Sequence, residues 1–358
     1  MDMVTSDDWH DPAQIARCSD RFLGSASGGP GNYFKEAKGS PWFKDGKRWQ
    51  RPEGPYSTDL IADFVTHFIE GMAGDSQPFF IYFAHYAPHW PLQANEEDVA
   101  PYRELYEKAD REALMPARLE RQMAAGLIPE GTTRNQSMIN AKPAAGGSLA
   151  AERMAMNAAM ITSIDRSVAD VMAALKKAGK LDNTLILVLS DNGAGNQMEL
   201  DRRVPDGVRP GSMNTFLNQG PALAALANTP LNGFKNTDYE GGIASPLIAW
   251  WPRGIQNRGR ISHRLTHLTD IMATCLELAG VSYPSEFEGR KIIASPGKSF
   301  VSVIRDEDDA RKTRRALVWP HALQDDDWKL VLENPATPEL YHIRLDRSEQ
   351  QNLATLLH

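Results

Sequence analysis

The chain has 358 residues, of which 42% are hydrophobic and 24% are charged, so it can form one large α/β domain, or a large domain with a small second one. A net charge of −7 and a pI near 5.8 argue against a nucleic-acid-binding protein, which would need a concentrated basic surface. The two cysteines, Cys18 and Cys275, are too few for a disulfide framework and lack the spacing of metal ligands.

The sequence also gives expectations about location. No apolar stretch reaches the roughly 18 residues of a membrane span. The N-terminal stretch MDMVTSDDWHDP is acidic where a secretory signal has a basic region followed by an apolar one. As written, the sequence predicts a cytoplasmic protein without membrane contact, and it leaves the oligomeric state open.

Three helical patterns alternate with three continuous apolar runs. In chain order, the elements are a helix at 57–72, a strand at 79–84 (FFIYFA), a helix at 161–175, a strand at 185–189, a strand at 246–251 (PLIAWW) and a helix at 268–276. Alternation of helices with doubly buried strands predicts an α/β fold with a mostly parallel central sheet covered on both faces.

Two further stretches have a different character. Residues 96–130 are charged and predict surface helices, whereas 131–150 has the composition of a flexible loop. Beyond Gly297, the segments RRALVW, DWKLVLE and ELYHIRL are short strand candidates separated by acidic turns. The sequence therefore predicts a large domain over 1–296 and a small antiparallel C-terminal α+β subdomain over 297–358.

Polar residues follow two of the predicted strands, at the sheet edge where ligands of open α/β sheets bind. His85 and His89 follow the first, and Asp191 with Asn192 follow the second. Carboxylate and amide oxygens are hard ligands suited to Ca²⁺ or Mg²⁺. The alternatives are an ordinary turn for Asp191-Asn192 and hydrogen-bonded packing groups for the histidines.

A glycine-flanked loop precedes the third apolar run. Residues 233–242 read GFKNTDYEGG, so the backbone can approach a ligand closely and Lys235 can supply a positive charge to an oxyanion. A lysine in such a loop is, in the alternative interpretation, simply solvated.

Taken together, these stretches resemble the sulfatase family, in particular its bacterial arylsulfatase-like members. The matching segments occur in the family's order between about Asp20 and Leu353: PFFIYFAHYAPHWPLQA, LDNTLILVLSDNGA, NTPLNGFKNTDYEGGIASPLIAWWPRGI, LTDIMATCLELAGV and DWKLV with ELYHI. The resemblance implies an alkaline-phosphatase-like α/β sandwich with a small C-terminal antiparallel subdomain, and hydrolysis of sulfate esters.

The resemblance also assigns roles to individual residues. Asp191 and Asn192 look like two ligands of an active-site Ca²⁺ or Mg²⁺. His89 looks like the histidine that contacts the sulfate ester and assists the leaving group, and Lys235 like the lysine that holds a sulfate oxygen. His85 is expected to be a packing or supporting group, and Glu240 is expected to orient the lysine loop.

The nucleophile motif of the family is absent from the sequence. These enzymes use a formylglycine made from Cys or Ser in a Cys/Ser-x-Pro-x-Arg signature, which supplies a hydroxyl for covalent catalysis. The nearest match, Ser282–Glu286 (SYPSE), has Glu in place of Arg, so no nucleophile is assigned. Asp7 and Asp8 follow a stretch too short and too polar to be the family's opening strand, which predicts a chain that lacks the N-terminal third of a sulfatase and binds its metal weakly.

Three functional hypotheses follow. The first is a sulfatase-type hydrolase of small-molecule or saccharide sulfate esters, truncated and therefore inactive or impaired. The second is a non-catalytic remnant or oxyanion-binding protein on the same scaffold, with His89 and Lys235 as the anion site. The third, phosphoryl or phosphonate transfer, is disfavoured because Lys235 precedes the EGG segment. The sequence does not specify the sulfate ester.

Overall fold

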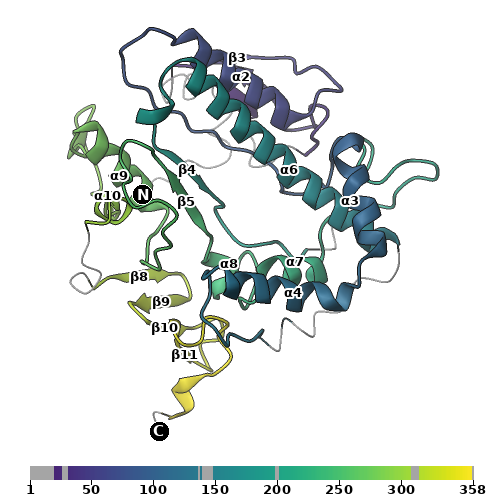
Figure 1. The fold of residues 1–358 in the computed structure, drawn as a ribbon, viewed down its shortest axis with the longest axis vertical. Helices are drawn as coiled ribbons and strands as arrows, with labels where there is room; N and C mark the ends of the chain where they lie inside the picture. Colours follow the sequence, from purple (N-terminus) through teal and green to yellow (C-terminus); the bar gives the residue numbers. More distant parts are fainter. Residues whose placement is uncertain are drawn as a thin grey trace.

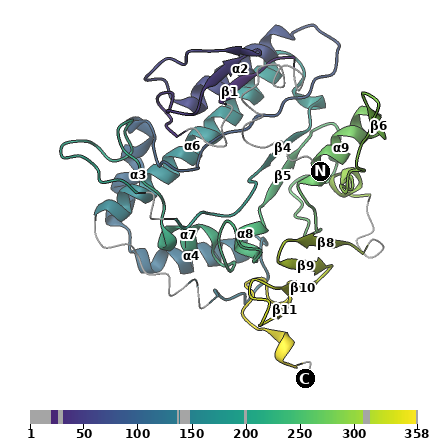
Figure 2. The same ribbon diagram turned by 180° about the vertical axis from the view of Figure 1, so that it is seen from behind.

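The computed structural model describes residues 20–25, 31–135, 138, 148–197, 201–307 and 314–356. Two long helices lie side by side at one end of the molecule, a two-stranded ribbon lies in the middle, and a four-stranded sheet lies toward the C-terminus (Figure 1). The view from behind shows the same three regions (Figure 2). Within the described ranges, no helix combines the length and apolarity needed to cross a membrane.

The helices follow the predicted patterns with shifted bounds. They are α2 (Ser57–Gly71), α3 (Glu96–Lys108), α4 (Arg111–Ala124), α6 (Ser148–Lys177), α7 (Pro221–Asn228), α8 (Glu240–Ile243), α9 (Thr269–Ala279) and α10 (Val301–Ile304), with 3₁₀ turns at Leu181–Asn183 and Leu353–Leu356. The charged stretch 96–130 is helical as predicted. Helix α6 begins well before the predicted start at 161, inside the stretch predicted as a loop, of which 139–147 lie outside the described residues.

All strands are short. They are β1 (Leu23–Ser25), β2 (Trp42–Lys44), β3 (Lys47–Arg48), β4 (Ile186–Leu189), β5 (Leu247–Trp250), β6 (Glu286–Phe287), β7 (Arg290–Lys291), β8 (Ala316–Trp319), β9 (Ala322–Asp325), β10 (Trp328–Val331) and β11 (Glu339–His342). They form sheets in the orders β1-β2-β3, β11-β10-β9-β8, β4-β5 and β6-β7. Strands β8, β10 and β11 coincide with the strand candidates predicted beyond Gly297, whereas β9 was not predicted. The division into two domains stays a prediction.

The predicted parallel sheet is not confirmed. Strands β4 and β5 pair antiparallel, with Ile186 opposite Trp250, and every other pairing in the described ranges is also antiparallel. The apolar run 79–84 pairs with no strand in those ranges and is only half-buried, because Phe80 and Tyr82 are 72% and 85% exposed. An apolar pattern decides which side chains are buried, but a strand forms only where a neighbouring backbone supplies hydrogen bonds.

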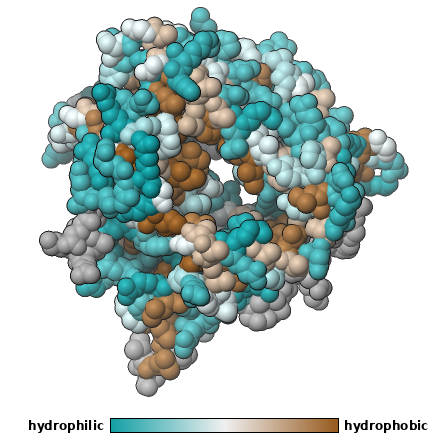
Figure 3. Space-filling model, viewed as in Figure 1, coloured by the Kyte–Doolittle hydropathy of each residue, from teal (hydrophilic) through white to brown (hydrophobic). Residues whose placement is uncertain are grey.

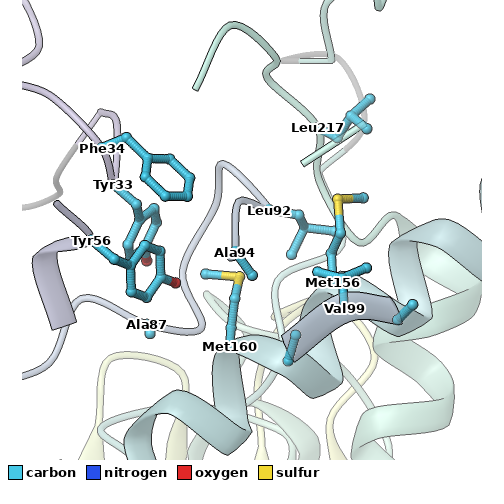
Figure 4. Close-up of a cluster of buried hydrophobic side chains, with 12 residues drawn as sticks. Tyr33, Phe34, Tyr56, Ala87, Leu92, Ala94, Val99, Met156, Met160 and Leu217 are labelled. Atoms are coloured by element: carbon cyan, nitrogen blue, oxygen red, sulfur yellow. The ribbon is translucent and has the colours of Figure 1, made fainter. Parts of the chain in front are cut away.

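The main core lies beneath the segment that carries His89. Tyr33 stacks on Tyr56 with ring centroids 5.2 Å apart, and Leu92 and Met160 fill the space beside them (Figure 4). A second cluster packs α2 against α6 and includes Val65, Ile69, Ala174 and Leu175. The two clusters hold α6 as a rigid support, against which the loop after residue 84 is placed.

Candidate functional site

The turn after β4 carries Asp191 and Asn192. The Ser190 hydroxyl donates to the Asn192 carbonyl at 2.9 Å, and the Asn192 amide donates to the Gly193 carbonyl at 3.0 Å. The side-chain amide N–H of Asn192 is thus used in a local bond, while the Asp191 side chain is exposed. The turn therefore presents oxygen atoms outward, as a cation or water site requires.

The lysine loop is joined to this turn by backbone hydrogen bonds. The N–H of Lys235 donates to the Ala194 carbonyl at 3.0 Å, and the N–H of Gly193 donates to the Gly242 carbonyl at 3.0 Å. The Asn228 side chain accepts from the N–H of Ala194 at 2.9 Å and donates to the Gly233 carbonyl at 3.0 Å. Two segments separated by some 40 positions in the sequence thus form one unit.

Asn228 is a residue that sequence reasoning missed. Its only sequence signal is its place at the end of α7, directly before Thr229 and Pro230, where a polar residue is ordinarily interpreted as a helix terminus. In the fold, its carboxamide is nearly buried and bridges the two site segments.

Glycine is required where these two segments meet. A Cβ atom at Gly193 would lie 1.7 Å from the Gly241 carbonyl oxygen, and one at Gly242 would lie 2.0 Å from the Thr237 carbonyl oxygen. Both contacts are with backbone atoms, which cannot move away as a flexible side chain can. The predicted close approach at the EGG segment is therefore between protein backbones.

His89 is held by its neighbours in the loop after residue 84. Its N–H donates to the Tyr86 carbonyl at 2.9 Å, and the Tyr33 hydroxyl donates to the His89 carbonyl at 2.8 Å. The Nδ1 atom lies 2.8 Å from the Trp90 carbonyl oxygen, which can only accept, so the neutral ring carries its proton on Nδ1. Nε2 is then the atom available to a ligand.

The electrostatics of His89 show which charges lie near it. Burial lowers its pKa below the ordinary value, the Trp90 carbonyl raises it, the Lys235 ammonium lowers it and the Asp191 carboxylate raises it. The two charged groups act on the imidazole because they lie within range of it. His89, Lys235 and Asp191 therefore lie close enough for their charges to interact, and the roles assigned to them stay predictions.

His85 lies apart from this corner. Its Nε2 is 2.9 Å from the Ser167 hydroxyl of α6, and its ring packs on Phe83 with centroids 4.1 Å apart. Burial lowers its pKa to about 4, so the ring is neutral at neutral pH. These contacts are those of a packing group.

Asp191 and Asn192 are the residues for which the sequence predicts a metal ion. In the ranges that the structure describes, no group of three or more His, Cys, Asp or Glu side chains is arranged to hold a metal ion. Asp191 and Asn192 supply suitable oxygen atoms, but two ligands on one turn are far fewer than the six to eight that Ca²⁺ takes. Asp191 and Asn192 could therefore hold such an ion only together with further ligands.

The nearest match to the nucleophile signature is not part of the site. Residues 282–286 are all exposed and lie between α9 and the β6–β7 hairpin. The backbone N–H of Ile292 donates to the Ser285 carbonyl. In the described part of the chain, residues 282–286 make no hydrogen bond to the corner at His89. Asp7, Asp8 and Cys18 lie outside the described residues.

Comparison with known proteins places this geometry in a family. A model of the sulfatase family matches residues 13–281. The chain is 31% identical over 328 residues to an uncharacterized sulfatase of Schizosaccharomyces pombe, covering 84% of this chain and 58% of that protein. It is 28% identical over 285 residues to an arylsulfatase of Klebsiella aerogenes, covering 75% of this chain and 60% of that protein.

Solved structures share the fold. The protein yidJ from Bacteroides fragilis aligns with a TM-score of 0.58 at 16% identity, covering 94% of this chain and 62% of that one. BT4656, solved in complex with its substrate D-glucosamine-2-N,6-O-disulfate, aligns with a TM-score of 0.57 at 19% identity, covering 94% of this chain and 72% of that one. The chain spans about three fifths of the length of the two curated relatives named above. It belongs to the sulfatase family.

Proposed function

We propose that this chain binds the sulfate group of an organic sulfate ester at the corner formed by His89, Lys235 and Asp191, as part of a sulfate ester hydrolase. The observation that carries the proposal is the electrostatic coupling of His89 to both Lys235 and Asp191, which supports one shared site. Membership in the sulfatase family supports the choice of sulfate as the anion.

Each side chain has a distinct chemical task in this proposal. The Lys235 ammonium has no hydrogen-bond or ion-pair partner among the described residues, so it is available to a sulfuryl oxygen. The His89 ring is oriented by its Nδ1–H bond to the Trp90 carbonyl, and Nε2 can donate a proton to the leaving oxygen when the ring is charged. Binding should tighten as the pH falls, because protonation of His89 adds a positive charge beside the anion.

The proposed ligand class is a small-molecule or saccharide sulfate ester. One curated relative is an arylsulfatase, and one structural neighbour was solved with a sulfated glucosamine. Asp191 and Asn192 would contribute two oxygen ligands to a weakly held Ca²⁺ or Mg²⁺. When bound, such an ion supplies positive charge that stabilises the sulfuryl oxygens.

A second candidate function is binding of the oxyanion without hydrolysis. The observation that favours it is the absence of a Cys/Ser-x-Pro-x-Arg segment from the printed sequence, because sulfatases depend on that segment for their nucleophile. Both candidates use the same corner and differ only in whether bound ester is turned over.

Calorimetry and a turnover assay with the same ligands test both candidates. Inorganic sulfate and an aryl sulfate are titrated into the wild-type chain and into His89→Ala, Lys235→Ala and the control Lys108→Ala, whose side chain lies on the exposed surface of α3. Loss of binding in the first two variants only supports the site. Hydrolysis of the aryl sulfate supports the hydrolase, and binding without hydrolysis supports the second candidate. Unchanged binding in both site variants contradicts both.

A further inference from the structure

The lysine loop is bonded on its far side to the C-terminal sheet. The N–H of Asp238 donates to the Glu333 carboxylate at 2.5 Å, and the Tyr239 hydroxyl donates to the Glu339 carboxylate at 2.5 Å. These residues directly follow the segment that carries Lys235. The loop is therefore fixed between two parts of the fold, the turn after β4 and the sheet β8–β11.

Glu240, the next residue, enters a fully buried ion cluster. The ammonium of Lys329, on β10, is 0% exposed and lies 2.9 Å from Glu240 and 2.8 Å from Glu349. The N–H of Glu240 donates to the second oxygen of Glu349 at 2.8 Å, and Arg347 lies 3.1 Å from the other oxygen of Glu240. Two cations and two carboxylates therefore join the lysine loop to the C-terminal segment.

The charges within the cluster are unequal. Burial raises the pKa of Glu349 to about 7, whereas Glu240, despite the opposing effect of burial, has a lowered pKa because Arg347 and Lys329 both stabilise its charge. The two cations therefore favour the ionised form of Glu240, which contacts the Lys329 ammonium at 2.9 Å. The anchor of the loop is thus a charge-assisted bond between two side chains that are almost completely buried.

Stability alone is a poor explanation of this arrangement. Removing charges from water is costly, and a buried ion pair contributes little net stability compared with apolar side chains of similar volume. Glu349 also has a φ of +52°, a left-handed conformation that is unfavourable for a side chain larger than glycine. The strained residue and the buried charge cluster lie at one point, where together they fix the position of the backbone.

We propose that Lys329 is a positioning residue for Lys235, acting through Glu240 to hold the lysine loop so that its ammonium faces the sulfate. This inference rests on the proposed function, because Lys235 needs a defined position only if it binds a ligand. In this proposal, the C-terminal sheet positions a side chain of the anion site. It also gives a mechanism to the expectation that Glu240 orients the lysine loop.

Sulfate affinity and the titration of His89 test this proposal in the full chain. Lys329→Met should weaken binding of inorganic sulfate roughly tenfold, the scale of one lost charge-assisted hydrogen bond. It should also raise the pKa of His89, in the same direction as Lys235→Met, because the ammonium that lowers this pKa moves away. The His89 ring is followed by NMR and identified by its loss in His89→Gln.

Two more variants separate positioning from general stability. Val331→Ala removes methyl groups from the buried side of the same strand, so it should destabilise the sheet while leaving sulfate affinity and the His89 pKa unchanged. Arg347→Gln alters a half-exposed member of the cluster, which the fold should tolerate, and should shift both measurements by a smaller amount in the same direction as Lys329→Met.

The outcomes distinguish the inference from the function on which it rests. If Lys235→Met weakens sulfate binding and raises the His89 pKa while Lys329→Met and Arg347→Gln change neither, the positioning role is wrong and the site stands. If Val331→Ala produces the same shifts as Lys329→Met, the effect is loss of stability and the inference is also wrong. If Lys235→Met itself changes neither measurement, the proposed function and the inference are both wrong.

Discussion

The C-terminal sheet and the centre of the molecule are built from similar apolar segments, but they differ in how completely those segments are paired and buried. In the C-terminal sheet, each of the strands β8–β11 has a hydrogen-bonded neighbour, and the sheet encloses a charged cluster that is almost fully buried. In the centre, β4 and β5 have no strand neighbour but each other among the described residues, and Ile248 is 63% exposed. Figure 3 shows hydrophobic residues around a hollow in the middle of this face.

The difference shows that an apolar segment joins a sheet only where a neighbouring strand pairs with it, so composition alone does not decide whether a sheet is completed. The segment 79–84 places Phe79, Ile81 and Phe83 against the helix core while Phe80 and Tyr82 face outward. Its alternation is that of a half-buried strand, although no strand in the described ranges pairs with it. Both regions border the proposed anion site. Substitutions in each region can therefore be compared for their effects on stability and on the site.

The largest effect is expected in the C-terminal sheet. Lys329→Met removes the cation shared by Glu240 and Glu349 and leaves buried carboxylates without their main partner. We expect a loss of about 3 to 5 kcal/mol in the free energy of unfolding, measured by urea denaturation. The loss should be smaller at pH 5 than at pH 8, because protonation neutralises the abandoned carboxylates. A loss below that of the exposed-pair variant Arg314→Gln would contradict the comparison.

The next effect is expected where the two regions meet. Gly193→Ala would place a methyl group 1.7 Å from the Gly241 carbonyl oxygen, so the turn after β4 and the lysine loop must separate. We expect a destabilisation of about 3 kcal/mol together with loss of sulfate binding. Gly71→Ala in α2 is the matched control, because a Cβ there meets nothing within 4 Å. It should be neutral or stabilise the protein by about 0.5–1 kcal/mol.

Acid should lower the free energy of unfolding by protonating His85. Because burial lowers the pKa of His85 to about 4, below its unfolded value, the neutral ring contributes stability in full above about pH 6.5. That contribution is lost as the pH falls toward 4, by at most about 3 kcal/mol. His85→Gln should flatten the stability profile between pH 6.5 and 4, as measured by urea denaturation. The exposed His263→Gln serves as control, and an equal flattening there would refute the assignment to His85.

Much of this could be predicted from the sequence, for identifiable reasons. Helical periodicity predicted α2 and α9. Polar residues after apolar runs singled out His89 and Asp191 as candidates, and a glycine-flanked loop singled out Lys235, because all these signals are local. The pairing of β4 with β5 could not be predicted, since direction depends on which distant segment is adjacent. The same limit applies to Lys329, which in the sequence is an ordinary lysine in a short strand and becomes a buried anchor only through Glu240 and Glu349.

The smallest effect is expected on the outward side of the central segment. Phe80→Ser removes a ring that is 72% exposed, so it should change the free energy of unfolding by less than about 0.5 kcal/mol. Phe83→Ala, three residues on and packed toward the cluster of Val65 and Leu175, should cost about 2 kcal/mol or more. Urea denaturation of both variants measures the contrast. Equal losses would mean that Phe80 is covered in solution, and the two regions would then not differ in the completeness of their packing.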